Sequence, residues 1–355
     1  MKAAVYYGRE DIRVEDVPEP VVRPGTVKVA VSWCGICGSD LHEFESGPAF
    51  APRPGAPHPL TGETLPIILG HEFAGHVVEI GESVHGFAVG DRVSVEPLLY
   101  CGACNECRRG DKHLCRKRGA HGVSGGGGGM SERTVVPAHM LHKLPDGMSD
   151  EMGALIEPLA VGFHAVRSSG FVPGDTALVT GAGPIGLAAL LALRASGART
   201  LIVSEISAAR QEFARRQGAF VVDPTTDDVR ARVAELTGKV GVDFAFEAAG
   251  VPPSLATAIS ATRPAGTVVN LAVWKTSIEL DPNKVFLSEQ RLTGSSCYCG
   301  QDFPAVIAMV ADGRIAAEDL VTAHVELADV VTGGFEELLA HRDEHVKILV
   351  GPGTS

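Results

Sequence analysis

The sequence lacks an excess of positive charge and is poor in aromatic side chains. Lys and Arg together number 31 against 43 Asp and Glu, so the formal net charge is −12, and aromatic residues make up 5% of the chain. Nucleic-acid binding depends on positive charge that meets the phosphates, and no basic stripe with interleaved aromatics offsets this deficit. We therefore expect no nucleic-acid partner.

Long hydrophobic runs are also scarce. The first residues, MKAAVYYGREDIRVED, carry charges from Lys2 onward and contain no apolar run typical of a signal peptide. The one candidate membrane span, residues 177–193, is short for a bilayer and is interrupted by GAGPIG. We expect neither export nor a membrane partner, and we place the protein in the reducing cytoplasm.

The chain contains eight cysteines. Lasting disulfides are rare in a reducing compartment, so clustered cysteines there are expected to bind a metal as thiolates. Four of them follow the spacing C-x2-C-x2-C-x7-C, namely Cys101, Cys104, Cys107 and Cys115. Four soft ligands in one segment suit tetrahedral zinc with no open position, which is a structural site. An iron–sulfur cluster and unliganded core thiols are the alternatives. Cys297 and Cys299 have no assignment beyond buried thiols.

The chain is long for a single hydrophobic core, so two domains are expected. Up to about residue 155 the pattern is one of short strand-like runs separated by Gly, Pro and Asp. From Glu157 onward, helical spacing alternates with near-continuous apolar runs such as TALVTG and TLIVSE. Runs of that kind are typical of parallel strands covered on both faces. The predicted fold class is therefore α/β, with a β-rich part and a parallel sheet.

The segment TALVTGAGPIGLAALLALRASG predicts a dinucleotide site between a strand and a helix. Its turn spans Gly181, Gly183, Pro184, Ile185 and Gly186. In this pattern the first glycine permits the turn, the second lets a pyrophosphate approach the backbone, and the third allows close helix packing. A plain glycine turn is the alternative.

The residue that follows the next apolar run predicts which cofactor binds. Glu205 stands nineteen residues after Gly186, where a carboxylate accepts hydrogen bonds from the ribose hydroxyls and repels a 2′-phosphate. NAD is therefore favoured over NADP, although Arg210 nearby could favour the phosphate.

A second group of possible metal ligands precedes the cysteine cluster. Cys37 lies in SWCGICGSDLHEF, His71 and Glu72 lie in GHEFAGH, and Glu157 begins the helical half. An incomplete ligand set leaves room for water or an alcohol, as a catalytic zinc requires. Taken singly, these residues also fit a buried thiol, a hydrogen-bonded core histidine and a carboxylate at a helix start.

Together these motifs resemble the zinc-dependent medium-chain alcohol dehydrogenases. CGICGSDLHEF, GHEFAGHVVEIG, GDRV, the four cysteines, EPLAV and GAGPIG occur in that family's order. The resemblance implies a GroES-like catalytic domain of residues 1–157 and 297–355, with a Rossmann NAD-binding domain, residues 158–296, inserted into it. It also implies two zinc ions per chain, one catalytic and one structural in the four-cysteine segment, and an active site in the cleft between the domains.

The resemblance carries roles over to individual residues. Cys37 and His71 match the first two catalytic zinc ligands, and Glu157 stands where classical members have a cysteine ligand. Carboxylates complete the shell in the polyol dehydrogenase branch, so Glu157 and Glu72 both remain candidates. Ser39 matches the hydroxyl that hydrogen-bonds the substrate alcohol, and His42 matches the histidine that passes the proton to solvent.

The resemblance also indicates a substrate class. The long insert before GHE and the VSGGGGGMSERTVV loop are similar to the branch that acts on 2,3-butanediol and acetoin, although Met130 replaces its usual aromatic residue. A sorbitol-like polyol or L-threonine is the alternative substrate, and a zinc- and nucleotide-binding protein without turnover is an alternative from another class. Family members form dimers and tetramers, so we expect a homo-oligomer.

Overall fold

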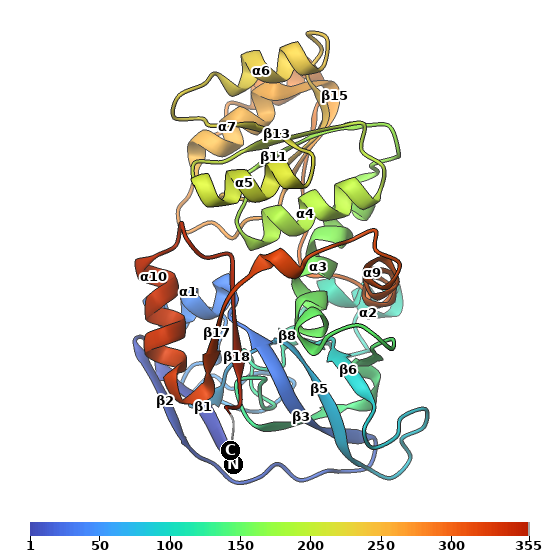
Figure 1. The fold of residues 1–355 in the computed structure, drawn as a ribbon, viewed down its shortest axis with the longest axis vertical. Coiled ribbons are helices and arrows are strands. Elements are labelled where there is room, and N and C mark those ends of the chain that lie inside the picture. Colours follow the sequence, from blue (N-terminus) through green and yellow to red (C-terminus); the bar gives the residue numbers. More distant parts are fainter. Residues whose placement is uncertain (354–355) are drawn as a thin grey trace. The chain divides into compact units, whose positions relative to one another are not determined.

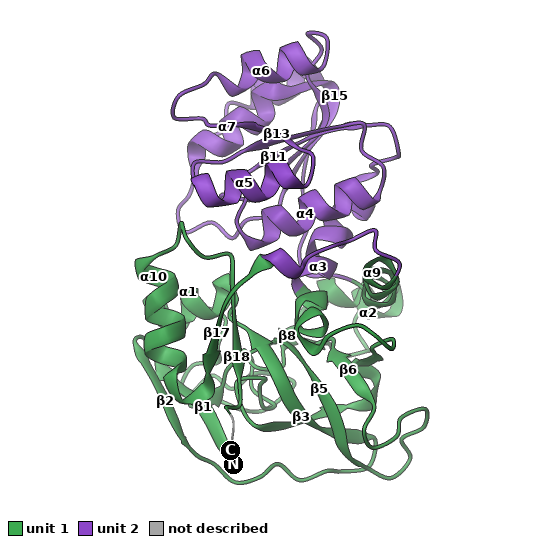
Figure 2. Cartoon of the chain, in the orientation of Figure 1, with its two compact units in different colours: residues 1–157, 299–311, 320–355 green, residues 158–298, 312–319 purple. Residues whose placement is uncertain are grey.

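The computed structural model describes residues 1–353 and divides into two compact units (Figure 2). Unit 1 comprises residues 1–157, 299–311 and the chain from residue 320, and unit 2 comprises residues 158–298 and 312–319. The chain therefore leaves unit 1, builds most of unit 2, returns to unit 1 at residue 299, and contributes residues 312–319 to unit 2 before it completes unit 1. The first crossing lies inside one helix, α3 (Asp150–Ser169), between Glu157 and Pro158.

Unit 1 is built around a mainly antiparallel sheet with β3 (Thr26–Gly35) at its centre (Figure 1). The strand order is β10-β6-β5-β3-β18-β17, and β9 pairs with β3 as well. Because β17 and β18 come from the C-terminal part of the chain, both ends of the sequence contribute to this sheet. The other members are β5 (Glu72–Ile80), β6 (Arg92–Val95), β9 (Arg133–Pro137), β10 (Leu141–Lys143), β17 (Val321–Glu326) and β18 (Lys347–Gly351).

Two smaller sheets complete the β structure of unit 1. In one of them β1 (Lys2–Gly8) lies between β2 (Asp11–Asp16) and β4 (Ile67–Ile68), and in the other β7 (Leu98–Leu99) pairs with β8 (Gly119–Ala120). The short helical segments of this unit are α1 (Gly38–Ser46), α2 (Asn105–Arg108), α9 (Asp302–Ala311), α10 (Glu337–Ala340), 3-10 turns at Lys112–Leu114, Ala138–Met140, Glu318–Leu320 and Leu327–Asp329, and a π-helix at Val330–Glu336.

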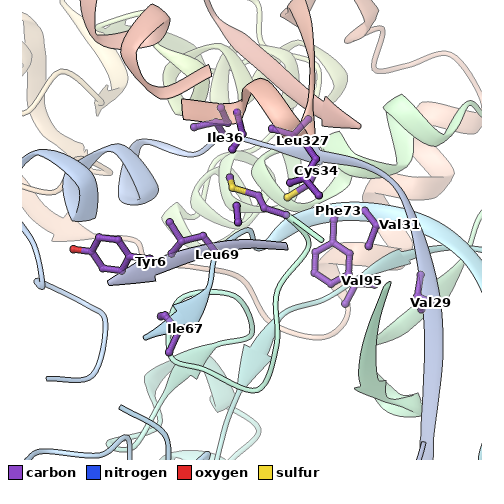
Figure 3. Packing of buried hydrophobic residues seen from close by; sticks show 14 of the residues in the cluster. Tyr6, Val29, Val31, Cys34, Ile36, Ile67, Leu69, Phe73, Val95 and Leu327 are labelled. Atoms are coloured by element: carbon purple, nitrogen blue, oxygen red, sulfur yellow. The ribbon is translucent and has the colours of Figure 1, made fainter. Parts of the chain in front are cut away.

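The core of unit 1 collects apolar side chains from these sheets (Figure 3). Alternate residues of β3, Val27, Val29 and Val31, are buried, as expected for a strand with one face on the core. Each buried side chain of this kind contributes about 1.5–3 kcal/mol relative to an exposed one. The core therefore fixes β3 and β5 side by side, and this pairing positions the residues that follow β3.

Unit 2 is organised by a parallel sheet with the order β13-β12-β11-β14-β15-β16. Every residue of β11 (Thr176–Thr180) is buried, which agrees with a strand covered on both faces. The order runs outward in both directions from β11, as in a doubly wound nucleotide-binding fold. The α/β fold class predicted from the apolar runs is confirmed. The other strands are β12 (Thr200–Ser204), β13 (Phe220–Val222), β14 (Val242–Glu247), β15 (Thr262–Asn270) and β16 (Arg291–Gly294).

Helices connect these strands and cover the sheet (Figure 1). They are α4 (Pro184–Ala195), α5 (Ala208–Arg216), α6 (Val229–Leu236), α7 (Pro252–Ala261) and α8 (Pro282–Ser288). Across residues 1–353, no helix combines the length and the apolar character that a membrane crossing requires.

Candidate metal and cofactor sites

The pairing of β3 with β5 brings Cys37, His71 and Glu72 together. Gly35, the last residue of β3, lies opposite Glu72, the first residue of β5. Cys37 follows two residues later as the N-cap of α1, and His71 immediately precedes β5. One possible ligand atom from each of the three residues lies within 4.8 Å of the other two. The group, here called the Cys37 site, is therefore set by strand register.

Asp40 lies beside the imidazole of His71. The His71 Nδ1 atom lies 3.3 Å from Asp40 Oδ1, and the other carboxylate oxygen of Asp40 accepts the Cys37 N–H at 3.0 Å. Asp40 is fully buried, so its position is fixed by these contacts. Because Nδ1 faces Asp40, Nε2 is the nitrogen that faces the rest of the site, as in histidine ligands supported by a carboxylate.

The electrostatics of His71 follow from these neighbours. Burial lowers the pKa of His71, but the negative charges of Asp40 and Cys37 outweigh it and raise the pKa well above its usual range. Sequence reasoning missed Asp40. A local pattern could have identified it. Asp40 occupies the third helical position after the N-cap residue Cys37, where a carboxylate typically accepts a hydrogen bond from the N-cap backbone N–H.

Glu72 forms a buried ion pair with Lys347. Glu72 Oε2 lies 2.6 Å from Lys347 Nζ, which also donates to the Ile36 carbonyl at 3.0 Å. Burial lowers the pKa of Lys347, but the charge of Glu72 outweighs it and raises the pKa above its usual range. Within the described residues, the buried Glu72 Oε1 atom has no hydrogen-bond partner, so it is available to a cation. Sequence reasoning missed Lys347, which lies 275 positions from Glu72 and opens an otherwise apolar strand.

The two carboxylates that the sequence offers as metal ligands are both buried in unit 1. Glu157 is buried in α3, and its charge contributes to the raised pKa of Lys347. The group whose ligand atoms lie within 4.8 Å of one another nevertheless contains Glu72 and not Glu157. Among the described residues, Glu72 is therefore the carboxylate assembled with Cys37 and His71.

The donor set of the Cys37 site fits zinc with an open position. A thiol, an imidazole and a carboxylate are all common zinc ligands, and three protein ligands leave a fourth position for substrate. Ser39 borders the site, because its Oγ lies 3.2 Å from His71 Nε2. His42 is one helical turn farther along α1, and its ring centroid lies 5.9 Å from that of Phe50.

The cysteine lobe, residues 101–115, gathers its four thiols through local turns alone. The sulfur atoms of Cys101, Cys104, Cys107 and Cys115 lie within 4.8 Å of one another, and none forms a disulfide. Backbone N–H groups of Ala103 and Cys104 donate to Cys101 and lower its pKa to about 6, whereas burial raises the pKa of Cys107 to about 12. Four soft donors around one point fit tetrahedral zinc, with no position left for substrate.

The glycine turn of unit 2 meets the steric demands of a dinucleotide site. Gly181 has φ +89°, and a Cβ there would meet Ala249 at 2.8 Å. A Cβ at Gly186 would collide with the Gly181 carbonyl. A Cβ at Gly183 would meet nothing within 4 Å, which leaves open space at the N-terminus of α4, whose first residues are Pro184 and Ile185. The turn is tight, and its middle glycine leaves room for a phosphate.

Glu205 is tied to this turn. It follows β12 and is buried, and its Oε2 accepts the Ala182 N–H at 2.5 Å. Its other oxygen accepts the N–H groups of Ile206 and Ser207. Arg210 lies in the first turn of α5, where its backbone N–H donates to Ser207 Oγ. The carboxylate is thus placed beside the glycine turn.

Comparison with known proteins gives full-length matches. Residues 23–146 match the alcohol dehydrogenase GroES-like domain, and residues 184–312 match the zinc-binding dehydrogenase family. The chain is 47% identical over 353 residues to the (R,R)-butanediol dehydrogenase of Bacillus subtilis, covering 99% of this chain and 100% of the relative. It is 42% identical over 354 residues to the enzyme of the same name from Neisseria gonorrhoeae, covering 99% of both.

A solved structure gives the same result. The X-ray crystal structure of 2R,3R-butanediol dehydrogenase from Bacillus subtilis matches with a TM-score of 0.93 and 46% identity, covering 99% of both chains. The predicted resemblance is confirmed: the chain belongs to the zinc-dependent alcohol dehydrogenase family, oxidoreductases that act on the CH–OH group of their substrates.

Proposed function

We propose that the protein interconverts 2,3-butanediol and acetoin with NAD as the hydride carrier. The Cys37 site carries this proposal, because it combines three zinc-type donors with the Ser39 hydroxyl 3.2 Å from His71 Nε2. The relatives named above support the choice of a vicinal diol over a sorbitol-like polyol or threonine. In the oxidative direction the secondary alcohol loses a hydride to NAD and a proton to the protein, and it becomes a ketone.

In this proposal unit 1 is the catalytic domain and binds two zinc ions. Cys37 and His71 hold the catalytic ion, with Glu72 as the nearest carboxylate and Glu157 as the remaining candidate, and the cysteine lobe holds the structural ion. When bound, the catalytic ion supplies a Lewis acid that polarises the alcohol oxygen, a contribution of about several kcal/mol.

The chain's own residues orient the site and move the proton. Ser39 accepts the proton of the substrate hydroxyl, and His42, one turn along α1, releases it to solvent. Asp40 lies beside Nδ1 of His71, so Nε2 faces the rest of the site, and Lys347 holds the buried carboxylate of Glu72 in place through their ion pair.

Unit 2 binds NAD in this proposal. The open space at Gly183 admits the pyrophosphate, and the N-terminus of α4 attracts its charge. The Glu205 carboxylate accepts hydrogen bonds from the ribose hydroxyls and repels a 2′-phosphate. Replacement Glu205→Ala is expected to reduce the preference for NAD over NADP, measured as the ratio of kcat/KM values. An unchanged ratio would assign the choice to Arg210 or to the backbone.

We also propose a homo-oligomer in the cytoplasm. All four residues of β16, an edge strand of the unit 2 sheet, are exposed, and Phe286 and Leu287 beside it are 74% and 79% exposed. An unprotected edge with apolar neighbours supports pairing with a second copy. The eight cysteines, all without disulfides, fit a reducing compartment.

One substrate panel tests the function. Formation of NADH is followed with butanediol stereoisomers, sorbitol and threonine, and reduction of acetoin is followed in reverse. We expect the highest kcat/KM with a butanediol, and loss of activity with a chelator. A higher kcat/KM for sorbitol or threonine would overturn the substrate, and full activity after verified removal of both metals would overturn the zinc chemistry.

A further inference from the structure

Glu43 is a buried carboxylate that the mechanism above does not use. It lies on α1, the helix of Ser39 and His42, and its side chain is fully shielded from solvent. Burial of a carboxylate away from solvent destabilises the folded protein unless the carboxylate oxygens accept hydrogen bonds. Its Oε1 atom accepts three consecutive backbone N–H groups, those of Ala49, Phe50 and Ala51. The negative charge is therefore balanced by the loop that follows the helix, the 47–51 loop.

Tyr6 and Gly47 complete the same anchor. The Tyr6 hydroxyl donates to the Glu43 carbonyl at 2.7 Å and lies 3.4 Å from Glu43 Oε2. Figure 3 shows the ring of Tyr6 at the margin of the labelled core residues, with its hydroxyl directed away from them. A Cβ at Gly47 would collide with this hydroxyl and with Glu43, so the loop closes on the carboxylate with no space to spare. Burial and the charge of Glu43 raise the pKa of Tyr6, so the hydroxyl stays protonated as a donor.

The anchored loop presents one aromatic side chain. The N–H of Phe50 points to Glu43, but its ring is 46% exposed and lies against the ring of His42, with centroids 5.9 Å apart and planes tilted by 54°. The next residue, Ala51, is buried and fixes the end of the loop. The contact between Phe50 and His42 therefore depends on a loop shape that Glu43 specifies.

We propose that Glu43 is a positioning residue that acts through the 47–51 loop and Phe50 on His42. This inference rests on the proposed role of His42 in releasing the proton. The ring of Phe50 packs against the imidazole and limits its rotation, so His42 keeps the orientation that serves Ser39. Glu43 touches neither substrate nor cofactor in this scheme.

A double-mutant cycle tests this path. Glu43→Gln and Phe50→Ala are each expected to lower kcat for alcohol oxidation about fivefold, well below the 10²–10⁴-fold loss of an acid–base group itself. The KM for NAD should stay unchanged, and added imidazole should restore kcat because a free base replaces the disturbed relay. The double variant should be no slower than either single variant, because both changes remove one ring contact. Effects that multiply, or the lack of rescue, would overturn the proposal.

Glu45→Gln is the matched control, because Glu45 lies on the same helix and its carboxylate pairs with Arg342. Hydrogen exchange of the Ala49, Phe50 and Ala51 amides should accelerate in Glu43→Gln and stay unchanged in Glu45→Gln. Equal exchange in both would overturn the anchor.

Two features keep the test decisive. The cycle is run with whichever alcohol of the substrate panel the wild-type protein oxidises fastest, so a wrong substrate does not affect it. If Glu43→Gln fails to fold, Phe50→Ala at its exposed ring must still show the lower kcat and the imidazole rescue, and their absence would overturn the proposal.

Discussion

The cysteine lobe takes its four sulfur atoms from fifteen consecutive residues, whereas the Cys37 site takes its groups from the end of β3, the start of β5 and the start of β18. Local turns alone bring the lobe together. The Cys37 site exists only when three strands are in register, and its carboxylate pairs with Lys347 from the C-terminal part of the chain. This difference suggests that the lobe serves stability and the Cys37 site serves chemistry.

The largest effect should come from removing the thiol of the Cys37 site. We expect Cys37→Ala to lower kcat/KM by about 10³-fold or more, because the Lewis acid loses a ligand. NAD binding, measured by calorimetry, should persist, since the glycine turn lies in unit 2. Wild-type turnover in this variant would contradict the catalytic assignment.

Removing a thiol of the lobe should instead affect folding. We expect Cys104→Ala to lose one equivalent of bound metal and to destabilise the fold by about 3 kcal/mol or more. Thermal unfolding and metal analysis check this, with the freshly prepared enzyme retaining most of its kcat. A variant with normal metal content and unfolding temperature would show that the lobe binds no ion.

The free energy of unfolding should fall at low pH for two separate reasons. Acid releases metal from thiolates, and it protonates buried histidines, so a variant is needed that removes the histidine contribution alone. Burial lowers the pKa of His121 to about 4 from its usual 6.5, so the unfolded chain binds a proton before the folded one does. The free energy of unfolding should therefore fall by about 3 kcal/mol as pH drops from 6.5 to 4. In His121→Gln this contribution to the slope of the unfolding free energy against pH should vanish, as measured by denaturant unfolding between pH 4 and 6.5. Identical slopes in both proteins would contradict it.

The smallest effect expected is that of the long-range ion pair. We expect Lys347→Met to weaken metal binding at the Cys37 site about 10- to 100-fold, as is usual for residues that support metal ligands. Competition with a chelator measures it, and metal in the lobe should be unaffected. Lys28→Met, which removes the ion pairs of the mostly buried Lys28 with Glu19 and Glu79, is the control. Equal metal affinity in both variants would show that the ion pair between Lys347 and Glu72 does not support metal binding at the Cys37 site.

The sequence predicted much of the fold and part of the site. The apolar runs around Gly181 indicated a parallel sheet, and the sheet of unit 2 confirms it. The cysteine spacing indicated one cluster, and the four sulfur atoms do lie together. The sequence did not indicate Asp40 or Lys347, because an aspartate in a helix turn and a lysine in a strand are common without any role in a site. The roles of Ser39, His42 and Glu205 remain predictions.

Composition and spacing by themselves determined the net negative charge and predicted the parallel sheet, the glycine turn and the membership of the lobe. The glycine turn and the lobe depend on residues close together in the chain, where local geometry leaves few arrangements, and the apolar runs mark each buried strand by its own composition. Only the tertiary structure decided that Glu72, and not Glu157, lies within 4.8 Å of Cys37 and His71, and that Lys347 faces it. Such contacts follow from strand register and burial across the whole unit, and neighbouring residues in the sequence do not encode them.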